Sequence, residues 1–332
     1  MKKMISIVIP VLNEEPNIRT AYDRILESYE FWKEKYDLEI IFTDNCSQDG
    51  TYNEVSCIAK DDPRIKIVRF ARNVGYQRSI LTGYLISSGD AVVQLDCDMQ
   101  DPPELIEKMI AKWEDGYQVV YGIRRSRKEG LIITGLRKIF YALVDALSSD
   151  ELPRNVGDFR LVDKRIVSVL DSLKSKSPYL RGQIAASGFN QYGFEYDRDE
   201  RKEGETKFKF GSLLRLAIDA IVGHSVQPLR LASYVGFLIT MIAIFMAFFY
   251  LGLWAFSSST PRGFMTLAIL VLFNIGFVSL FLGIIGEYII RIVEQLTFGP
   301  ISIIESSINI DSQIIEKRSQ ILAAQIQESV KK

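Results

Sequence analysis

Two long stretches without a charged residue constrain this chain more than any other feature of its sequence. They cover residues 231–256 and 263–286. A helix needs about 20 apolar residues to cross a bilayer, and each stretch is longer than that. The connector between them, residues 257–262, is short. We therefore predict transmembrane helix 1 at 231–256 and transmembrane helix 2 at 263–286, joined as a hairpin. Buried core helices are the alternative, which this length disfavours.

The basic residues around the hairpin predict its orientation. Arg230 precedes the first stretch and Arg291 follows the second, whereas the connector holds only Arg262. Cytoplasmic flanks of membrane helices carry an excess of lysine and arginine. We therefore expect an integral membrane protein with both termini in the cytoplasm. Residues 211–230 are predicted to form an amphipathic juxtamembrane segment and residues 287–332 a cytoplasmic tail.

Residues 1–210 have a different pattern, in which apolar β-branched runs alternate with segments of helical periodicity. The runs are Ile5–Leu12, Leu38–Thr43, Ile65–Arg69, Ala91–Leu95 and Val119–Gly122. Such alternation is typical of βαβ crossovers and of a parallel sheet with helices on both faces. We predict a cytoplasmic α/β domain, Rossmann-like with a mostly parallel sheet. Val156–Val162 and Gln191–Tyr196 are predicted as further strands, the second at a sheet edge.

Two aspartates one residue apart, Asp96 and Asp98, follow the fourth of these runs. In open α/β sheets, ligands bind at the carboxyl ends of the strands. Two such carboxylates, with no basic residue near them in sequence, repel each other unless a cation lies between them. Oxygen ligands suit Mg²⁺, which takes one or two protein carboxylates together with substrate phosphates. We predict a metal site here, and an Asp-rich turn that caps a helix is the structural alternative.

Polar residues also close the first and second runs, so three strand ends bring polar groups to one crevice. Pro10, Asn13 and Glu14 close the first run, and Asp44 closes the second. A carboxylate can accept a hydrogen bond from a nucleobase N–H, and glutamate or asparagine can bind ribose hydroxyls. We therefore predict a nucleotide site. For the segment Asp44–Thr51 the alternative is an Asx turn followed by a helix cap.

Composition excludes several other classes of protein. The formal net charge is −1, so no overall field directs the chain to nucleic acid. The three cysteines, Cys46, Cys57 and Cys97, are scattered and odd in number, which indicates a reducing compartment and no disulfide framework. The apolar segment at the N-terminus is too short for a signal peptide.

Six motifs carry a resemblance to a known family. They are Val8–Glu14, Asp44–Thr51, Gln94–Glu104, Gly157–Leu161, Arg181–Gly182 and Arg201–Phe208. Through them the chain resembles the family 2 glycosyltransferases of GT-A fold. Within these it is similar to the polyprenyl-phosphate glycosyltransferases, which include the dolichol-phosphate-mannose synthases and the bactoprenol glucosyltransferases. A two-span hairpin is similar to the bactoprenol branch.

The resemblance implies inverting transfer of a hexose from a nucleotide sugar to a polyprenyl phosphate at the cytoplasmic membrane face. We expect glucose from UDP-glucose, undecaprenyl phosphate as acceptor, Mg²⁺ or Mn²⁺ as cofactor, and a homo-oligomer. GDP-mannose or another UDP-sugar is the alternative donor. The alternative outside the enzymes is a membrane scaffold or flippase subunit with a degenerate nucleotide domain, against which the intact Asp96 and Asp98 pair argues.

On the donor side, the resemblance assigns Asp96, Asp98 and Gln100 to the nucleotide sugar and its metal, with Asp98 also in a catalytic role. Arg124, at the start of a basic loop, is expected to close over the donor diphosphate, unless it is an ordinary solvated charge.

On the acceptor side, Asp158 is expected beside the acceptor as a base or an organiser, unless it forms an ion pair with Arg160 or another basic group. A phosphate monoester is largely a dianion at pH 7, so it needs positioning more than deprotonation. Arg201 and Lys207 are assigned to neutralise that phosphate, and the alternative for them is a basic anchor to anionic lipid.

The chain departs from the family pattern at two cysteines. Cys46 occupies a position where the family usually has glycine, and cysteine tolerates a positive φ poorly, so whether the turn is kept is open. Cys97 lies between Asp96 and Asp98, and we interpret it as spacing rather than as a metal ligand. The Gln-x-x-Arg-Trp signature of processive synthases is absent, which argues against polysaccharide synthesis.

Overall fold

The computed structural model describes most of the predicted α/β domain and parts of the remaining chain. The described residues are 2–125, 156–173, 178–197, 234–238, 241, 245, 248, 263–296 and 302–311. The chain divides into two compact units. One contains residues 1–128, 152–205 and 297–332, and the other contains 129–151 and 206–296. The first unit is called the catalytic domain below.

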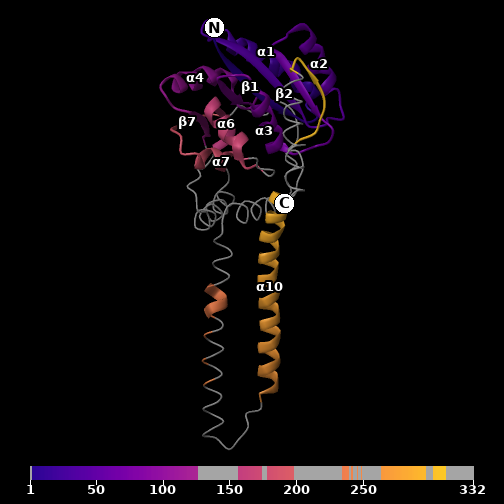
Figure 1. The fold of residues 1–332 in the computed structure, drawn as a ribbon, viewed down its shortest axis with the longest axis vertical. Coiled ribbons are helices and arrows are strands. Elements are labelled where there is room, and N and C mark those ends of the chain that lie inside the picture. Colours follow the sequence, from indigo (N-terminus) through magenta and orange to yellow (C-terminus); the bar gives the residue numbers. More distant parts are fainter. Residues whose placement is uncertain are drawn as a thin grey trace, which may run out of the picture. The chain divides into compact units, whose positions relative to one another are not determined.

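An eight-stranded sheet forms the centre of the catalytic domain, in the order β7-β5-β6-β4-β1-β2-β3-β8 (Figure 1). The strands are β1 (Lys3–Val11), β2 (Tyr36–Asp44), β3 (Ile65–Phe70), β4 (Ala91–Gln94), β5 (Val119–Arg124), β6 (Val156–Asp163), β7 (Gln191–Tyr196) and β8 (Ile304–Ile308). Seven of these strands coincide with the predicted runs, and β7 lies at a sheet edge as expected.

The helices between the strands also follow the sequence pattern. They are α1 (Glu15–Tyr29), α2 (Thr51–Asp61), α3 (Tyr76–Ile86), α4 (Ile106–Glu114) after the short 3₁₀ helix η1 (Pro103–Leu105), α6 (Lys164–Leu173) and α7 (Leu180–Ala186). α1 ends at Tyr29. The chain after Tyr29 closes in tight turns, in which the backbone N–H of Trp32 donates to the carbonyl of Tyr29.

The sheet is mixed, where the sequence predicted a mostly parallel one. The pairs β1–β2, β1–β4, β2–β3 and β5–β7 are parallel. β6 is antiparallel to both β4 and β5, and β8 is antiparallel to β3. A buried apolar run has the same pattern whether its neighbouring strand is parallel or antiparallel. The sequence pattern therefore predicted the strands but not the antiparallel pairing of β6 and β8.

Each face of the sheet carries its own hydrophobic core because side chains alternate along a strand. On β1, Ile5, Ile7 and Ile9 face the core that is shared with α1, α2 and α4. Val8 faces the other core, which is shared with α3, α6 and α7. All four side chains are fully buried. The two layers of helices fix the sheet, and therefore fix the strand ends that carry the polar residues.

The strand β8 was not predicted, and it comes from the tail beyond the second apolar stretch. It pairs with β3 at the edge of the sheet, where it is drawn in yellow (Figure 1). Its Ser306 shares a hydrogen bond of 2.9 Å with Tyr52 of α2. The side-chain amide of Asn309 donates to the carbonyls of Ala59 and Ile65, at 2.6 and 2.9 Å. Residues 312–332 of the predicted tail lie outside the described residues.

The second unit contains α10 (Phe264–Leu296), one continuous helix of 33 residues that includes the second apolar stretch. Leu267, Phe273 and Leu282 are among its exposed side chains. Within the part of the chain that the structure describes, no helix is both long and apolar enough to cross a membrane. The predicted transmembrane hairpin is therefore not supported there. The amphipathic segment 211–230 and most of the first stretch lie outside the described residues.

Candidate active site

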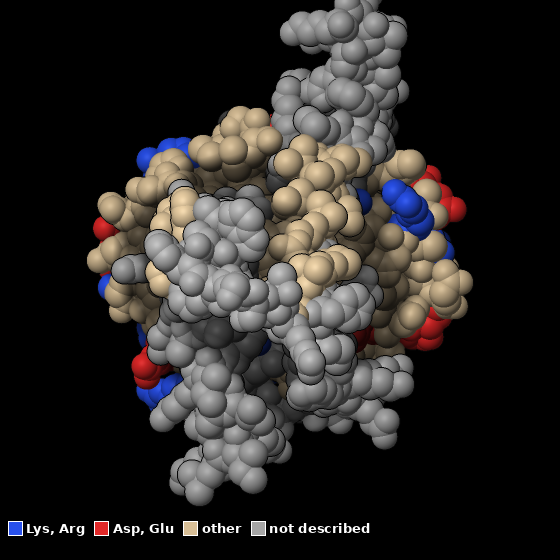
Figure 2. Space-filling model, turned by 90° about the horizontal axis from the view of Figure 1, so that it is seen from below, with Lys and Arg blue, Asp and Glu red and all other residues tan. Residues whose placement is uncertain are grey.

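The carboxyl ends of β1, β2 and β4, which are neighbours in the sheet, meet at a cavity of about 350 Å³. The lining residues are Pro10, Val11, Leu12, Glu14, Asn45, Asn73, Gly75, Tyr76, Asp96, Cys97 and Asp98. The predicted crevice at these three strand ends is therefore present. We call it the donor cavity. Figure 2 shows one face of the molecule. The acidic and basic side chains visible there are interspersed around the edge of the view, in keeping with the net charge of −1.

Three residues just beyond these strand ends have a backbone conformation that side chains rarely adopt. Asn13, Cys46 and Met99 have φ values of 56°, 64° and 52°. The turn at Cys46 is thus kept although the glycine is absent, at a cost of roughly 1–2 kcal/mol for the left-handed conformation. Sterically strained residues of this kind gather at functional sites. Each strand end turns sharply here and presents the polar residues that follow it.

Hydrogen bonds between the first two strand ends use the predicted ribose ligands. The side-chain carbonyl of Asn13 accepts from the backbone N–H of Gln48 at 2.8 Å, and the backbone N–H of Asn13 donates to Ser47 Oγ at 3.0 Å. The Glu14 carboxylate accepts from Asn17 at 2.6 Å and lines the donor cavity. Asn13 therefore holds the two loops together, whereas Glu14 faces the cavity.

Asp44 combines the two interpretations that the sequence left open. Its Oδ1 accepts from the backbone N–H of Ser47 at 3.0 Å, which is an Asx turn. Its Oδ2 is buried and accepts no hydrogen bond from the residues that the structure describes. Arg69 is the nearest cation, with Nη1 at 3.4 Å from that oxygen. A buried oxygen of this kind is costly unless a ligand donates to it.

Asp96 lies at the other end of the donor cavity in a polar network that the sequence did not predict. The hydroxyl of Tyr76 donates to Asp96 Oδ1, and Gln94 Nε2 donates to the same oxygen at 2.9 Å. Burial is the largest cause that raises the pKa of Asp96 to about 6. The negative charges of Asp101 and Asp98 act in the same direction. Tyr76 had no sequence signal, since only the fold brings α3 to β4.

The pair of carboxylates fits a divalent cation. Asp96 and Asp98 both line the donor cavity, and the excess of negative charge there raises the pKa of Asp96. Among the described residues, no group of three or more His, Cys, Asp and Glu side chains surrounds a common point. Two carboxylates, completed by water and substrate phosphate, form the donor set that Mg²⁺ prefers. Cys97 is buried, and burial raises the pKa of its thiol.

Gln100 and Arg124 do not line the donor cavity. Gln100 is buried, and its backbone N–H donates to Asp98 at 3.2 Å. Arg124 Nη2 donates to the buried carboxylate of Asp101 at 2.9 Å, and the Tyr196 hydroxyl donates to the same carboxylate at 2.5 Å. Arg124 is half-buried and anchors the loop that carries Asp98 and Asp101. Its expected closure over the donor diphosphate stays a prediction.

Gly157 and Asp158 show why this part of β6 is constrained. A Cβ atom on Gly157 would lie 2.7 Å from Arg124 Nη2, so a side chain there would require that guanidinium to move. Asp158 forms a bidentate ion pair with Arg181, at 2.8 and 2.5 Å, and not with Arg160. Burial acts to raise the pKa of Asp158, but the hydrogen bonds and charge of Arg181 outweigh it and hold the pKa below the ordinary value.

Arg201 and Lys207, the residues assigned to the acceptor, lie outside the described residues. Of the predicted site residues that are described, Pro10, Glu14, Asp96 and Asp98 come together in one cavity. Asp44, at the end of β2, and Asn13, which follows β1, do not line it and accept backbone N–H groups of the loop 45–50. Asp158 is electrostatically coupled to Asp96 from β6.

Comparisons with known proteins show what the chain is similar to. A family model described as Glycosyl transferase family 2 matches residues 6–170. The chain is 40% identical over 309 residues to "Uncharacterized glycosyltransferase YkcC" of Bacillus subtilis (strain 168), covering 93% of this chain and 95% of that protein. It is 33% identical over 309 residues to the bactoprenol glucosyl transferase of Shigella phage SfII, covering 91% and 98%. Among solved structures, the mannosyltransferase PcManGT from Pyrobaculum calidifontis, in complex with GDP-Man and Mn2+, matches at 16% identity with a TM-score of 0.46, covering 89% of this chain and 88% of that one.

Proposed function

Because this chain belongs to glycosyl transferase family 2 and has its GT-A fold, we propose that it transfers glucose from UDP-glucose to undecaprenyl phosphate with inversion at the anomeric carbon. The relatives named bactoprenol glucosyl transferase span nearly the whole chain, which supports a lipid-linked acceptor. The observation that carries the proposal is the donor cavity itself. Its lining contains the Asp96 and Asp98 carboxylates, and it contains Asn45, which directly follows the buried Asp44.

The donor nucleotide fits the polar groups of the donor cavity. Asp44 Oδ2 is an acceptor without a hydrogen-bond partner among the described residues, and the uracil ring offers one N–H donor. A matched donor removes the penalty of the buried oxygen. Glu14 lines the same cavity and can accept from a ribose hydroxyl. The donor diphosphate then faces Asp96 and Asp98.

Asp96 and Asp98 would hold Mg²⁺ or Mn²⁺ against the diphosphate. Such an ion supplies Lewis-acid stabilisation of the negative charge that develops on the leaving nucleoside diphosphate. Tyr76 and Gln94 fix the Asp96 carboxylate by hydrogen bonds to Oδ1 and leave Oδ2 to the cavity side. Partners that orient a metal ligand in this way commonly change metal affinity 10–100-fold when they are removed.

The acceptor phosphate requires orientation rather than a strong base, because a phosphate monoester is already largely a dianion at pH 7. Asp158 is held as a carboxylate by Arg181, which suits an organiser of the acceptor side better than a proton acceptor. We assign Arg201 and Lys207 to the acceptor phosphate. Charge-assisted hydrogen bonds of that kind contribute about 1.5–3 kcal/mol each.

We also propose that the enzyme acts at the cytoplasmic face of a membrane as a homo-oligomer. The support is the absence of charge from residues 231–256 and 263–286 and the exposure of apolar side chains such as Leu267 and Leu282 along α10. An apolar side chain that remains exposed along a long helix favours an apolar surrounding.

The test is a panel of radiolabelled nucleotide sugars, incubated with undecaprenyl phosphate and membranes that contain the full-length chain. We expect lipid-linked product from UDP-glucose and a β-linked sugar in that product. Membranes that contain an Asp98→Ala variant provide the matched control. Product from GDP-mannose or another UDP-sugar alone would overturn the proposed donor, and product on a non-lipid acceptor alone would overturn the proposed acceptor.

A further inference from the structure

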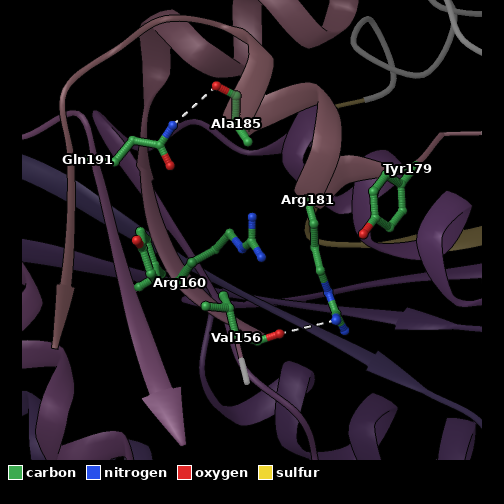
Figure 3. A pocket seen from close by; sticks show the side chains of 7 residues that line it. Val156, Arg160, Tyr179, Arg181, Ala185 and Gln191 are labelled. Carbon is green, nitrogen blue, oxygen red and sulfur yellow. Dashed lines mark hydrogen bonds between the residues drawn. The ribbon is translucent and has the colours of Figure 1, made fainter. Parts of the chain in front are cut away.

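A second cavity, of about 60 Å³, lies within the catalytic domain. β6 contributes Arg160, α7 contributes Arg181 and Ala185, and β5 and β7 contribute Tyr121 and Gln191. None of its lining residues lines the donor cavity. Figure 3 shows the guanidinium of Arg160 in the middle of the ring of labelled residues.

Arg160 is the unusual member of this cavity. Only 5% of the residue is exposed, yet the one hydrogen bond that its guanidinium forms with a described residue goes to the carbonyl of Gly157, at 2.9 Å from Nη2. Among the described residues, no carboxylate lies within 4.0 Å of its guanidinium. Burial lowers the pKa of Arg160, but a guanidinium stays charged in proteins. A buried cation with one neutral acceptor is costly unless an anion completes it.

The surroundings leave this charge uncompensated. Asp158 is the carboxylate nearest in the sequence, but both its oxygens are taken by Arg181. The two arginines and one aspartate therefore sum to one positive charge at the cavity. Arg181 Nη1 is further fixed by the carbonyl of Val156 at 3.1 Å (Figure 3). Tyr121 and Gln191 add a hydroxyl and an amide to the wall.

The size of the cavity narrows the class of ligand. One water needs roughly 10–15 Å³ of such space, so this cavity has room for a few waters or for one small polyatomic anion. The planar fork of an arginine matches the oxygens of phosphate in a bidentate fashion. A nucleotide, a sugar or an acyl chain is too large to enter.

We propose that this cavity is a binding site for one tetrahedral oxyanion of the phosphate class, held by Arg160 with Arg181 beside it. The bound anion neutralises the charge of Arg160 and stabilises the position of the Asp158–Arg181 ion pair. The phosphate can be free inorganic phosphate or the end of a phosphate monoester. For free inorganic phosphate the inference is independent of the sugar donor and of the lipid proposed above, whereas for a phosphate monoester it rests on the proposed acceptor.

The experiment measures thermal unfolding of the full-length chain in detergent, with EDTA present, as inorganic phosphate replaces chloride at constant ionic strength. A second arm adds farnesyl phosphate, with farnesol as its control. Ligand that binds only the folded state raises Tm, and a rise of a few degrees at saturation is expected. Arg160→Gln is expected to abolish the rise. Ala185→Val narrows the cavity while it keeps Arg160, and it is expected to do the same.

Arg165→Gln is the matched control, because Arg165 is an exposed arginine just after β6 that pairs with Asp163. It is expected to keep the full rise in Tm. A rise with phosphate supports the free anion as the source, and a rise only with farnesyl phosphate supports the monoester. The proposal is overturned if neither raises Tm of the unaltered chain, or if Ala185→Val and Arg165→Gln respond alike. If Arg160→Gln does not fold, Ala185→Val decides alone.

Discussion

At the scale of single residues, the donor cavity depends on carboxylate oxygens that neighbouring residues hold in place through hydrogen bonds. Asp98 has its side chain in the cavity wall and accepts the backbone N–H of Gln100. Asp96 beside it is fixed by Tyr76. The carboxylate pair is therefore held ready for a cation before any substrate arrives, which is how preorganised charge lowers a reaction barrier.

Removal of the Asp98 carboxylate is expected to abolish metal-dependent transfer. Asp98→Ala leaves one carboxylate for the ion, so we expect kcat to fall by at least a hundredfold while the chain still reaches the membrane fraction. Excess EDTA should silence the unaltered chain, and Mn²⁺ or Mg²⁺ should restore it. Glycosyl transfer at full rate in EDTA would contradict a metal-dependent mechanism.

Cys46 offers a test of backbone strain. Its φ of 64° costs a cysteine roughly 1–2 kcal/mol, and glycine avoids that cost but loses about 0.5–1 kcal/mol through the entropy of the unfolded chain. Cys46→Gly is therefore expected to raise the free energy of unfolding by up to about 1 kcal/mol in chemical denaturation. Cys57→Gly is the control, because Cys57 is exposed in the helix α2, where glycine is unfavourable. It is expected to lower the free energy of unfolding. Equal changes in both variants would show that the turn is not strained.

Asp158 should give the folded domain a sensitivity to acid. Arg181 lowers the pKa of Asp158 in the folded state, so the stabilisation is present above the unfolded pKa of about 3.9 and is lost as pH falls through the folded value. We expect Tm to fall as pH drops from about 5 to 3, and Asp158→Asn to make this slope shallower. Asp23→Asn, at an exposed position, should leave the slope unchanged. An identical dependence of Tm on pH in both variants would show that Asp158 does not cause the acid sensitivity.

At the scale of elements, the sequence predicted β1 to β5 because each is an apolar run of strand length, and β7 because polar and apolar residues alternate along it. It missed β8, a five-residue segment, Ile-Glu-Ser-Ser-Ile, in which three of five residues are polar. It placed Asp96, Asp98 and Asp44 at strand ends correctly. It could not pair Asp158 with Arg181, because residues 23 positions apart meet only through the packing of α7 on β6.

The edge strand β8 depends on Asn309, which follows it with a φ of 58°. The Asn309 side-chain amide donates to two carbonyls, one near the end of α2 and one at the first residue of β3. Asn309→Ala loses both hydrogen bonds and places alanine in the left-handed region. We expect a loss of about 2 kcal/mol in the free energy of unfolding. Asn309→Gly should lose less because it keeps the conformation.

The matched control for β8 is Asn53→Ala, at an exposed position on α2, where alanine favours the helix. It should leave the free energy of unfolding unchanged or slightly raise it. A loss from Asn53→Ala as large as from Asn309→Ala would show that the effect belongs to α2 and not to the docking of β8.

At the scale of the whole molecule, the proposed membrane topology places the connector outside and both ends of the chain inside. With the three native cysteines replaced, a single cysteine at Ser258 should react with an impermeant maleimide in intact cells. One placed at Lys332 should react only after the membrane is opened. The reverse pattern of labelling would place the catalytic domain on the wrong side for a cytoplasmic nucleotide sugar.

The origin of β8 has a consequence for how the protein is made. A ribosome delivers residues 1–125 long before residues 304–308, and both proposed membrane segments must emerge in between. Until then, the outer edge of β3 presents unpaired backbone groups, the kind of edge on which sheets from different chains join. The nascent domain therefore stays incomplete until its tail returns. Chaperone occupancy should persist on chains arrested before residue 304 and end on chains released beyond residue 309.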